Sequence, residues 1–174
     1  TTGRDQVFLG TQAGMSIRFA EGDVRTMGRA AYGVRGIKLR GDDKVVAMEV
    51  VESGGTILTV TEHGYGKRTE LKEYRVQSRG GVGIIDIHTS SRNGNVVGTA
   101  CVHTEDEVMI ITQRGKVLRM VVGDVRPIGR ATQGVCVIEM KDGDRVVSMA
   151  RLRREEDEDV EPQEKDSSAR ALTD

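Results

Sequence analysis

The stretch RVQSRGGVG, residues 75–83, combines residue types that suit an anionic ligand. An arginine fork can hold two phosphate oxygens, and glycines without side chains let backbone N–H groups come close to a negative charge. Gln77, Arg79, Gly80 and Gly81 supply these groups. The pattern predicts a loop that contacts phosphates through its backbone and its arginine, rather than a flexible hinge.

Other chemistries find little support in the sequence. Cys101 and Cys136 lack the spacing of a metal site, and His63, His88 and His103 form no ligand cluster with them. Both cysteines lie in apolar runs, which predicts buried, reduced thiols. No Ser-His-Asp candidate, paired carboxylates or Walker loop is recognisable. We therefore expect a binding chain with no catalytic residue, no metal and no cofactor of its own.

The composition favours one domain rich in turns. The chain has 174 residues, only five aromatic residues, 22 glycines and two prolines, so its core must consist of aliphatic side chains. It contains neither an apolar run of about 18 residues nor a signal-peptide pattern, and we expect a cytoplasmic protein without membrane contact. The sequence begins Thr-Thr-Gly, from which we expect a fragment of something longer.

The net charge of −1 conceals two oppositely charged parts. Residues 155–174 hold nine acidic against two basic residues, whereas residues 1–154 hold 24 basic against 18 acidic ones, a net of +6. A basic body with an acidic tail is typical of nucleic-acid partners. We expect the tail to be disordered. It either folds back on the basic surface and weakens DNA binding, or only aids solubility.

The sequence repeats itself three times. TQAGMSIRF from Thr11, TEHGYGKRT from Thr61 and TQRGKVLRM from Thr112 align at offsets of 50 and 51 residues. The same offsets superimpose glycines, arginines and acidic residues, which indicates a repeat architecture. The recurring sets are Gly14, Gly64 and Gly115; Arg18, Arg68 and Arg119; Asp23, Glu73 and Asp124; Arg25, Arg75 and Arg126; Arg29, Arg79 and Arg130; and Gly33, Gly83 and Gly134.

Each repeat is interpreted as four short strands, because aliphatic and β-branched runs alternate with Gly- and Asp-containing turns. In the third repeat these runs are EVMIIT, KVLRMV, VCVIEM and RVVSMARL. The prediction is an all-β, propeller-like partial ring with blades at residues 1–53, 54–103 and 104–154. A closed propeller needs about four to eight blades. Either further blades precede this sequence, or two copies associate to cover the open edges.

Repeats related by rotation would place the recurring arginines in a stripe that suits the phosphates of a duplex. The opposing interpretation is structural: the arginines at 18, 68 and 119 would pair with the acids at 23, 73 and 124. Further cations cluster around the first hairpins of the second and third repeats. The predicted DNA-binding residues are Arg18, Arg29, Lys67, Arg68, Gln77, Arg79, Gly80, Gly81, Arg114, Lys116, Arg119 and Arg130.

Residues 5–152 resemble the C-terminal domain of the gyrase A protein of DNA gyrase, whose fold is a propeller-like β-pinwheel. GYGKRTELKEY, SRNGNVVGTACV, IGRATQGVCVI and DRVVSM are similar to the last three blades of that family, and the acidic tail also matches. The resemblance implies non-sequence-specific wrapping of double-stranded DNA in support of negative supercoiling. The implied partners are the remainder of gyrase A and the ATPase, gyrase B, in the nucleoid. ATP, Mg²⁺ and the catalytic residues would belong to the complete topoisomerase.

One motif departs from the family pattern Q-R-R-G-G-(K/R)-G. Here Ser78 and Val82 replace two basic residues, so only Gln77, Arg79 and the glycines carry over, and the full motif is expected upstream. The corresponding C-terminal domain of topoisomerase IV is the nearest alternative. A protein-binding propeller is another, and it would show mixed charge or an apolar patch on its rim. An enzymatic propeller is disfavoured by the absent His/carboxylate cluster.

Overall fold

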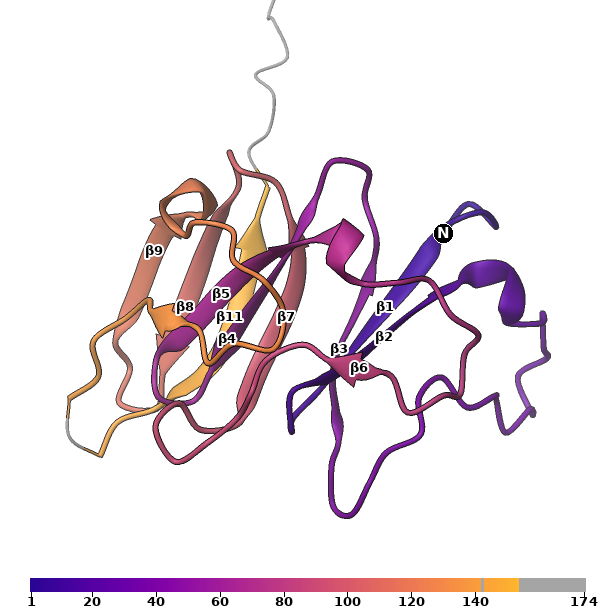
Figure 1. Ribbon diagram of the computed structural model, residues 1–174, viewed down its shortest axis with the longest axis horizontal. Coiled ribbons are helices and arrows are strands. Elements are labelled where there is room, and N and C mark those ends of the chain that lie inside the picture. Colours follow the sequence, from indigo (N-terminus) through magenta and orange to yellow (C-terminus); the bar gives the residue numbers. More distant parts are fainter. Residues whose placement is uncertain (142, 154–174) are drawn as a thin grey trace, which may run out of the picture.

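The computed structural model describes residues 1–141 and 143–153 as three antiparallel β-sheets that follow one another along the chain. The predicted acidic tail lies outside the described residues. Figure 1 shows the third sheet at the left, the first at the right and the second between them. The all-β prediction is confirmed. The strands are β1 (Gln6–Thr11), β2 (Met15–Ala20), β3 (Val45–Val50), β4 (Thr56–Thr61), β5 (Tyr65–Glu70), β6 (Ile84–Ile85), β7 (Val96–Val102), β8 (Glu107–Thr112), β9 (Val117–Val121), β10 (Val135–Cys136) and β11 (Val146–Leu152).

Tight hairpins begin each repeat, as the recurring glycines predict. Gly14, Gly64 and Gly115 all have φ near +80°, a conformation that costs glycine nothing, and each donates its N–H to the threonine three residues earlier. After the second strand of each hairpin the chain makes one 3₁₀ turn. These turns are η1 (Glu21–Asp23), η2 (Leu71–Glu73) and η3 (Val122–Asp124), and the described residues contain no α-helix.

The second and third repeats each contain four strands, as predicted, and the first contains three, but the sheets exchange strands between repeats. The strand β6 belongs to the second repeat but pairs with β2 of the first sheet, and β10 of the third repeat pairs with β5 of the second sheet. The run VCVIEM therefore contributes only Val135–Cys136 as a strand, and it does so to the preceding sheet. The third sheet has three strands in the order β11-β8-β9.

Two hairpin glycines are required by this exchange. A Cβ on Gly14 would lie 2.2 Å from the carbonyl oxygen of Ile87, and one on Gly64 would lie 2.2 Å from that of Ile138. The two carbonyl oxygens of the hairpin glycines in turn accept hydrogen bonds from the N–H groups of Ile87 and Ile138, each in the following repeat. Any side chain at Gly14 or Gly64 would push the exchanged strand away from its sheet.

The core lies between the sheets. Phe8, Ile57, Tyr74 and Cys101 are buried between the first and second sheets, where the rings of Phe8 and Tyr74 meet edge to face at 5.1 Å. A larger aliphatic cluster fills the space between the second and third sheets. Its buried members are Leu58, Val60, Ala100, Val102, Val108, Ile110, Val122, Val125, Ile138 and Val146.

The two cysteines differ in their environment. Burial raises the pKa of the Cys101 thiol, whereas Cys136 is exposed, so the prediction of two buried thiols is wrong for Cys136. Its place in a two-residue outer strand explains the exposure. Within the described ranges no group of three potential ligands is arranged to hold a metal ion. The described part of the chain also has no helix with the length and apolarity to cross a bilayer.

The hairpin glycines give a test of the strand exchange. We expect Gly64→Ala to lower the free energy of unfolding by about 3 kcal/mol or more, because strain at positive φ adds to a clash with the exchanged strand. Gly115→Ala is the matched control. It has the same φ, but nothing lies within 4 Å of its Cβ position, so we expect a loss of about 1 kcal/mol. Urea unfolding followed by circular dichroism measures both, and equal losses would contradict the exchange.

Candidate nucleic-acid interface

An exposed arginine follows each 3₁₀ turn. Arg25, Arg75 and Arg126 come two residues after the ends of η1, η2 and η3, and all three side chains are exposed. None of the three makes a side-chain hydrogen bond or ion pair with another residue in the described ranges. In Figure 1 the three turns succeed one another from right to left across the upper part of the molecule. We call these three arginines the rim arginines.

Two of the rim arginines, Arg75 and Arg126, each directly follow a buried apolar residue, which we call its anchor. Tyr74 and Val125 are 1% and 4% exposed and pack into the cores between successive sheets. Both anchors have extended backbone, so the next side chain points to the opposite side. Burial of the anchors therefore turns Arg75 and Arg126 outward. Sequence alone offers no reason to prefer this set over the other recurring arginines.

The arginines at 79 and 130, four residues further on, make hydrogen bonds within the fold. Arg79 donates through Nε to the carbonyl of Asp23 (2.8 Å) and through Nη1 to that of Arg35 (3.0 Å). Arg130 donates to the carbonyl of Ile85 at 2.5 Å, and Ile85 is the repeat equivalent of Arg35. Both side chains thus connect their own repeat to the preceding one by hydrogen bonds. These bonds occupy guanidinium N–H groups that would otherwise be free to bind a phosphate.

The glycine-rich loop is likewise a junction between repeats. The N–H of Gly80 donates to the Gly36 carbonyl at 2.5 Å, and the Gly81 carbonyl accepts from Lys38 at 2.8 Å. The N–H of Gln77 donates to the carbonyl of Arg18 at 2.9 Å. The N–H groups of Gly80 and Gln77 are thus already engaged within the fold, and a phosphate contact of this loop stays a prediction. Both glycines lie close to the preceding repeat, since a Cβ on Gly80 would come 3.3 Å from the Arg35 oxygen and one on Gly81 3.8 Å from Ile17.

The arginines at the first recurring position are also engaged within the fold. Arg18 donates to the carbonyls of Leu71 and Tyr74, and Arg68 donates to the Thr104 hydroxyl. Desolvation lowers the pKa of both guanidinium groups. Arg119 is exposed but pairs with Glu107. These arginines are thus engaged within the fold, but not with the acids at 23, 73 and 124.

Lys67 lies in the interior, away from any surface ligand. Its Nζ is 2.9 Å from Oδ1 of Asp86 and donates to the Thr69 hydroxyl at 2.7 Å. The same carboxylate accepts hydrogen bonds from Tyr74 (2.5 Å) and Thr59 (2.7 Å). Burial lowers the pKa of Lys67 and, together with Asp86, raises the pKa of Tyr74. The buried ion pair and its hydroxyl partners thus fix the segment that leaves β6, a strand of the first sheet, to the second sheet.

The remaining predicted contacts lie at the surface but not together. Arg29 and Arg114 are exposed, and Lys116 donates to the carbonyl of Glu139 at 3.1 Å. Arg114 and Lys116 belong to the turn before β9, whereas Arg126 follows the turn after it. The five residues of β9 separate the two groups by about 17 Å. A duplex that follows a straight path across the three rim arginines would therefore contact Arg126 but not Arg114 or Lys116.

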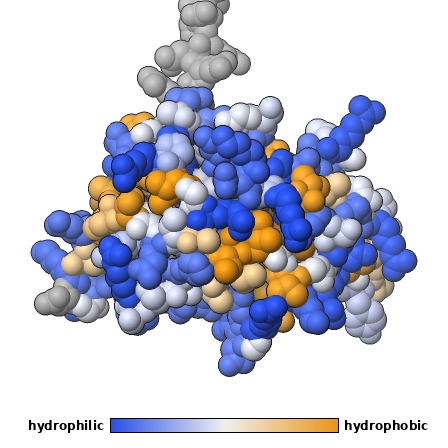
Figure 2. Space-filling view, in the orientation of Figure 1, coloured by the Kyte–Doolittle hydropathy of each residue, from blue (hydrophilic) through white to orange (hydrophobic). Residues whose placement is uncertain are grey.

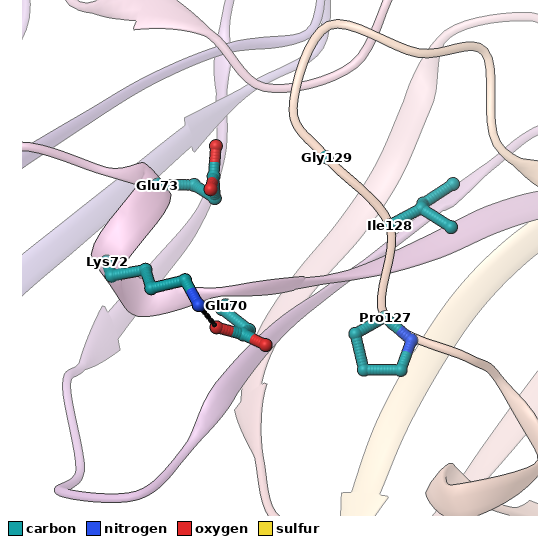
Figure 3. A pocket seen from close by; sticks show the side chains of 6 residues that line it. All are labelled: Glu70, Lys72, Glu73, Pro127, Ile128 and Gly129. Carbon is teal, nitrogen blue, oxygen red and sulfur yellow. Dashed lines mark ion pairs between the residues drawn. The ribbon is translucent and has the colours of Figure 1, made fainter.

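A small pocket interrupts the basic rim between the second and third repeats. Figure 3 shows Glu70, Lys72 and Glu73 on one side and residues 127–129 on the other. Lys72 pairs with Glu70, so two carboxylates and one ammonium face this space. The rim thus carries mixed charge at this point, not an unbroken positive stripe.

A family model and the most similar curated proteins point to the same protein family. The family described as the DNA gyrase C-terminal domain, a beta-propeller, matches residues 5–52, 55–103 and 106–153. The gyrase A protein of Haloquadratum walsbyi is 47% identical over 90% of this chain, and that of Salmonella typhimurium is 46% identical over 91%. The chain spans about a fifth of the length of these relatives, 19% and 18%.

Two solved structures share the fold. A DNA gyrase A C-terminal domain has a TM-score of 0.80 at 30% identity, and the match covers 86% of this chain and 51% of that one. The C-terminal domain of a DNA topoisomerase IV has a TM-score of 0.82 at 26% identity, with coverage of 87% and 47%. The match to each solved domain therefore extends over about half of it.

Substitution of the buried Lys67 tests whether it has a structural role that an exposed lysine does not have. We expect Lys67→Met to lower the free energy of unfolding by about 3–5 kcal/mol, because it leaves the Asp86 carboxylate buried without its counter-charge. Lys116→Met, the same change at an exposed lysine, should cost less than about 0.5 kcal/mol. Chemical unfolding of both variants checks this. Equal stability of the two would show that the Lys67–Asp86 pair does not hold the junction.

Proposed function

Because the chain belongs to the DNA gyrase C-terminal domain family, we propose that residues 1–153 bind double-stranded DNA along the rim, without regard to sequence, and bend it. The observation that carries the proposal is the recurrence of one exposed arginine at the same place in three successive repeats. Repeats in a curved row offer a duplex evenly spaced cationic contacts. Such contacts go to phosphates, which position DNA but do not specify its sequence.

The charge and surface of the body support this role. Residues 1–154 carry a net charge of +6, which attracts a polyanion and speeds its association at low salt. Figure 2 shows a face that is largely hydrophilic, with apolar patches that are separate from one another. Nothing on this face resembles one continuous apolar binding platform. A duplex that touched all three rim arginines would follow the curvature of the repeats, and the contacts would offset the cost of bending.

The role in a complete enzyme is a further part of the proposal. The family suggests that bending presents a neighbouring DNA segment for strand passage, in support of negative supercoiling. The remainder of a gyrase A protein and the ATPase, gyrase B, would supply the catalytic residues, ATP and Mg²⁺. The described residues would then contribute DNA geometry rather than bond chemistry. In a topoisomerase IV, the same surface would be used in the same way.

A protein partner is a second candidate, and the mixed-charge pocket favours it. Glu70, Lys72 and Glu73 offer both signs of charge beside Pro127 and Ile128, an arrangement that suits a polar peptide better than a phosphate backbone. The two functions differ in their dependence on salt and on the rim arginines.

Titration of a long duplex across salt concentrations tests the DNA proposal. We expect log affinity to fall steeply with log salt and to be the same for unrelated sequences. Arg75→Ala and Arg126→Ala should each reduce the slope by about 0.9, because each removes one phosphate contact. Fluorescence anisotropy measures the affinities, and energy transfer between the ends of a labelled duplex measures bending.

Arg40→Ala is the control, because it removes the same charge from an exposed arginine that is equivalent to no rim position. We expect a small loss of affinity, because the net positive charge falls by one, and an unchanged slope of log affinity against log salt. A slope that drops equally in all three variants would assign binding to net charge alone. A flat salt response would favour the protein partner.

A further inference from the structure

An acidic residue stands two positions before each rim arginine. These residues, Asp23, Glu73 and Asp124, are the last residues of η1, η2 and η3, and all three side chains are exposed. We call them the rim acids. The sequence predicted that they pair with the arginines of the first hairpins, but those arginines bond to other groups. The recurrence of the rim acids therefore needs another explanation.

The fold itself does not use the carboxylates of the rim acids. In residues 1–141 and 143–153, none of them makes a side-chain hydrogen bond or ion pair with another residue. Each 3₁₀ turn is closed by backbone groups, since the N–H of the residue after the acid donates to the first carbonyl of the turn. Beside Glu73, the ammonium of Lys72 pairs with Glu70 (Figure 3). The rim acids are thus available to act on whatever approaches from outside.

A rim acid and its rim arginine are close enough to act on the same ligand. Cα atoms two residues apart lie at most about 7 Å from each other. A phosphate that Arg75 or Arg126 binds then lies about 10 Å or less from a carboxylate, which is about the Debye length at 0.1 M salt. The repulsion at this distance weakens binding by about twofold for each carboxylate. It is therefore large enough to measure.

We propose that the rim acids limit the affinity of the rim for double-stranded DNA, because each carboxylate repels the phosphate that the neighbouring rim arginine binds. This inference rests on the proposed binding of DNA by the rim arginines. The three acids cancel the three arginines in net charge, so the net charge of +6 on residues 1–154 comes from the rest of the body. The body attracts the duplex from a distance, and the rim holds it by weak contacts that can be released one at a time.

Two double variants with the same change of net charge test the proposal. One combines Glu73→Gln with Asp124→Asn on the rim. The other combines Asp42→Asn with Glu139→Gln, two exposed acids beside the hairpin tips. The six residues of β2 and of β5 separate these tips from the rim by about 20 Å. This distance is about twice the Debye length at 0.1 M salt, so the control acids are screened from the bound duplex.

Fluorescence anisotropy with the full 174-residue chain and a long duplex, at 0.1 M salt and without divalent cations, measures the affinities. We expect the rim double variant to bind about fourfold more tightly than the original chain, and the control double variant to stay within about 1.5-fold of it. The gain should shrink as salt rises, because screening removes the repulsion. A gain caused by altered packing would not shrink in this way. Circular dichroism should show the same fold in all chains, because the substituted side chains are exposed.

A third comparison tests whether the effect is local. In an Arg75→Ala chain, Glu73→Gln should bring a smaller gain, because no phosphate is held beside it. Equal gains in the two double variants would assign the effect to net charge and overturn the proposal. Unchanged or weaker binding of the rim double variant would also overturn it. If Arg75→Ala and Arg126→Ala keep the original salt slope, the proposed DNA contact fails as well, whereas a lowered slope without a gain in the rim double variant contradicts this inference alone.

Discussion

The strand that each repeat lends to the sheet before it is the interaction on which the rest of the structure depends. Only two residues pair in β6 and in β10, yet each pair brings a whole loop against the previous repeat. The N–H groups of residues 86 and 87 reach the carbonyl of Gly14, and the arginine at 79 or 130 completes the junction. Backbone groups make most of these bonds, so the strand pairing itself depends little on side chains except where a Cβ would intrude.

The buried polar network complements the backbone junction. Asp86 comes directly after the exchanged strand, and its carboxylate meets Lys67 and Tyr74 in the interior. A buried charge is costly unless it is paired and hydrogen-bonded, so the network is favourable only in the register that satisfies every member. The second junction has no such pair, because Val137 occupies the equivalent position of Asp86. The two junctions therefore share their backbone geometry but differ in how their interiors are filled.

The sequence predicted the all-β class, the repeat period and the hairpin glycines, because these depend on local conformation. It did not predict the exchange of strands. The run at 84–85 follows the same aliphatic pattern whether it completes its own sheet or the preceding one. The residues proposed to contact DNA were harder still to predict, since recurrence shows that an arginine matters without showing what it contacts. Burial of the neighbouring Tyr74 separates Arg75 from Arg79, and burial is a property of packing. The burial of Lys67 could not be predicted either, because a lysine next to an arginine in the sequence usually indicates an exposed position.

Exchange of strands also means that no repeat is a complete unit of folding. Removal of the third repeat would strip the second sheet of its outer strand, and loss of the second would do the same to the first. Stability is therefore passed along the row from each repeat to its neighbour, as in other repeat proteins. A duplex that pulled on the rim would load these junctions in series, and the force would be carried by backbone hydrogen bonds across the sheets.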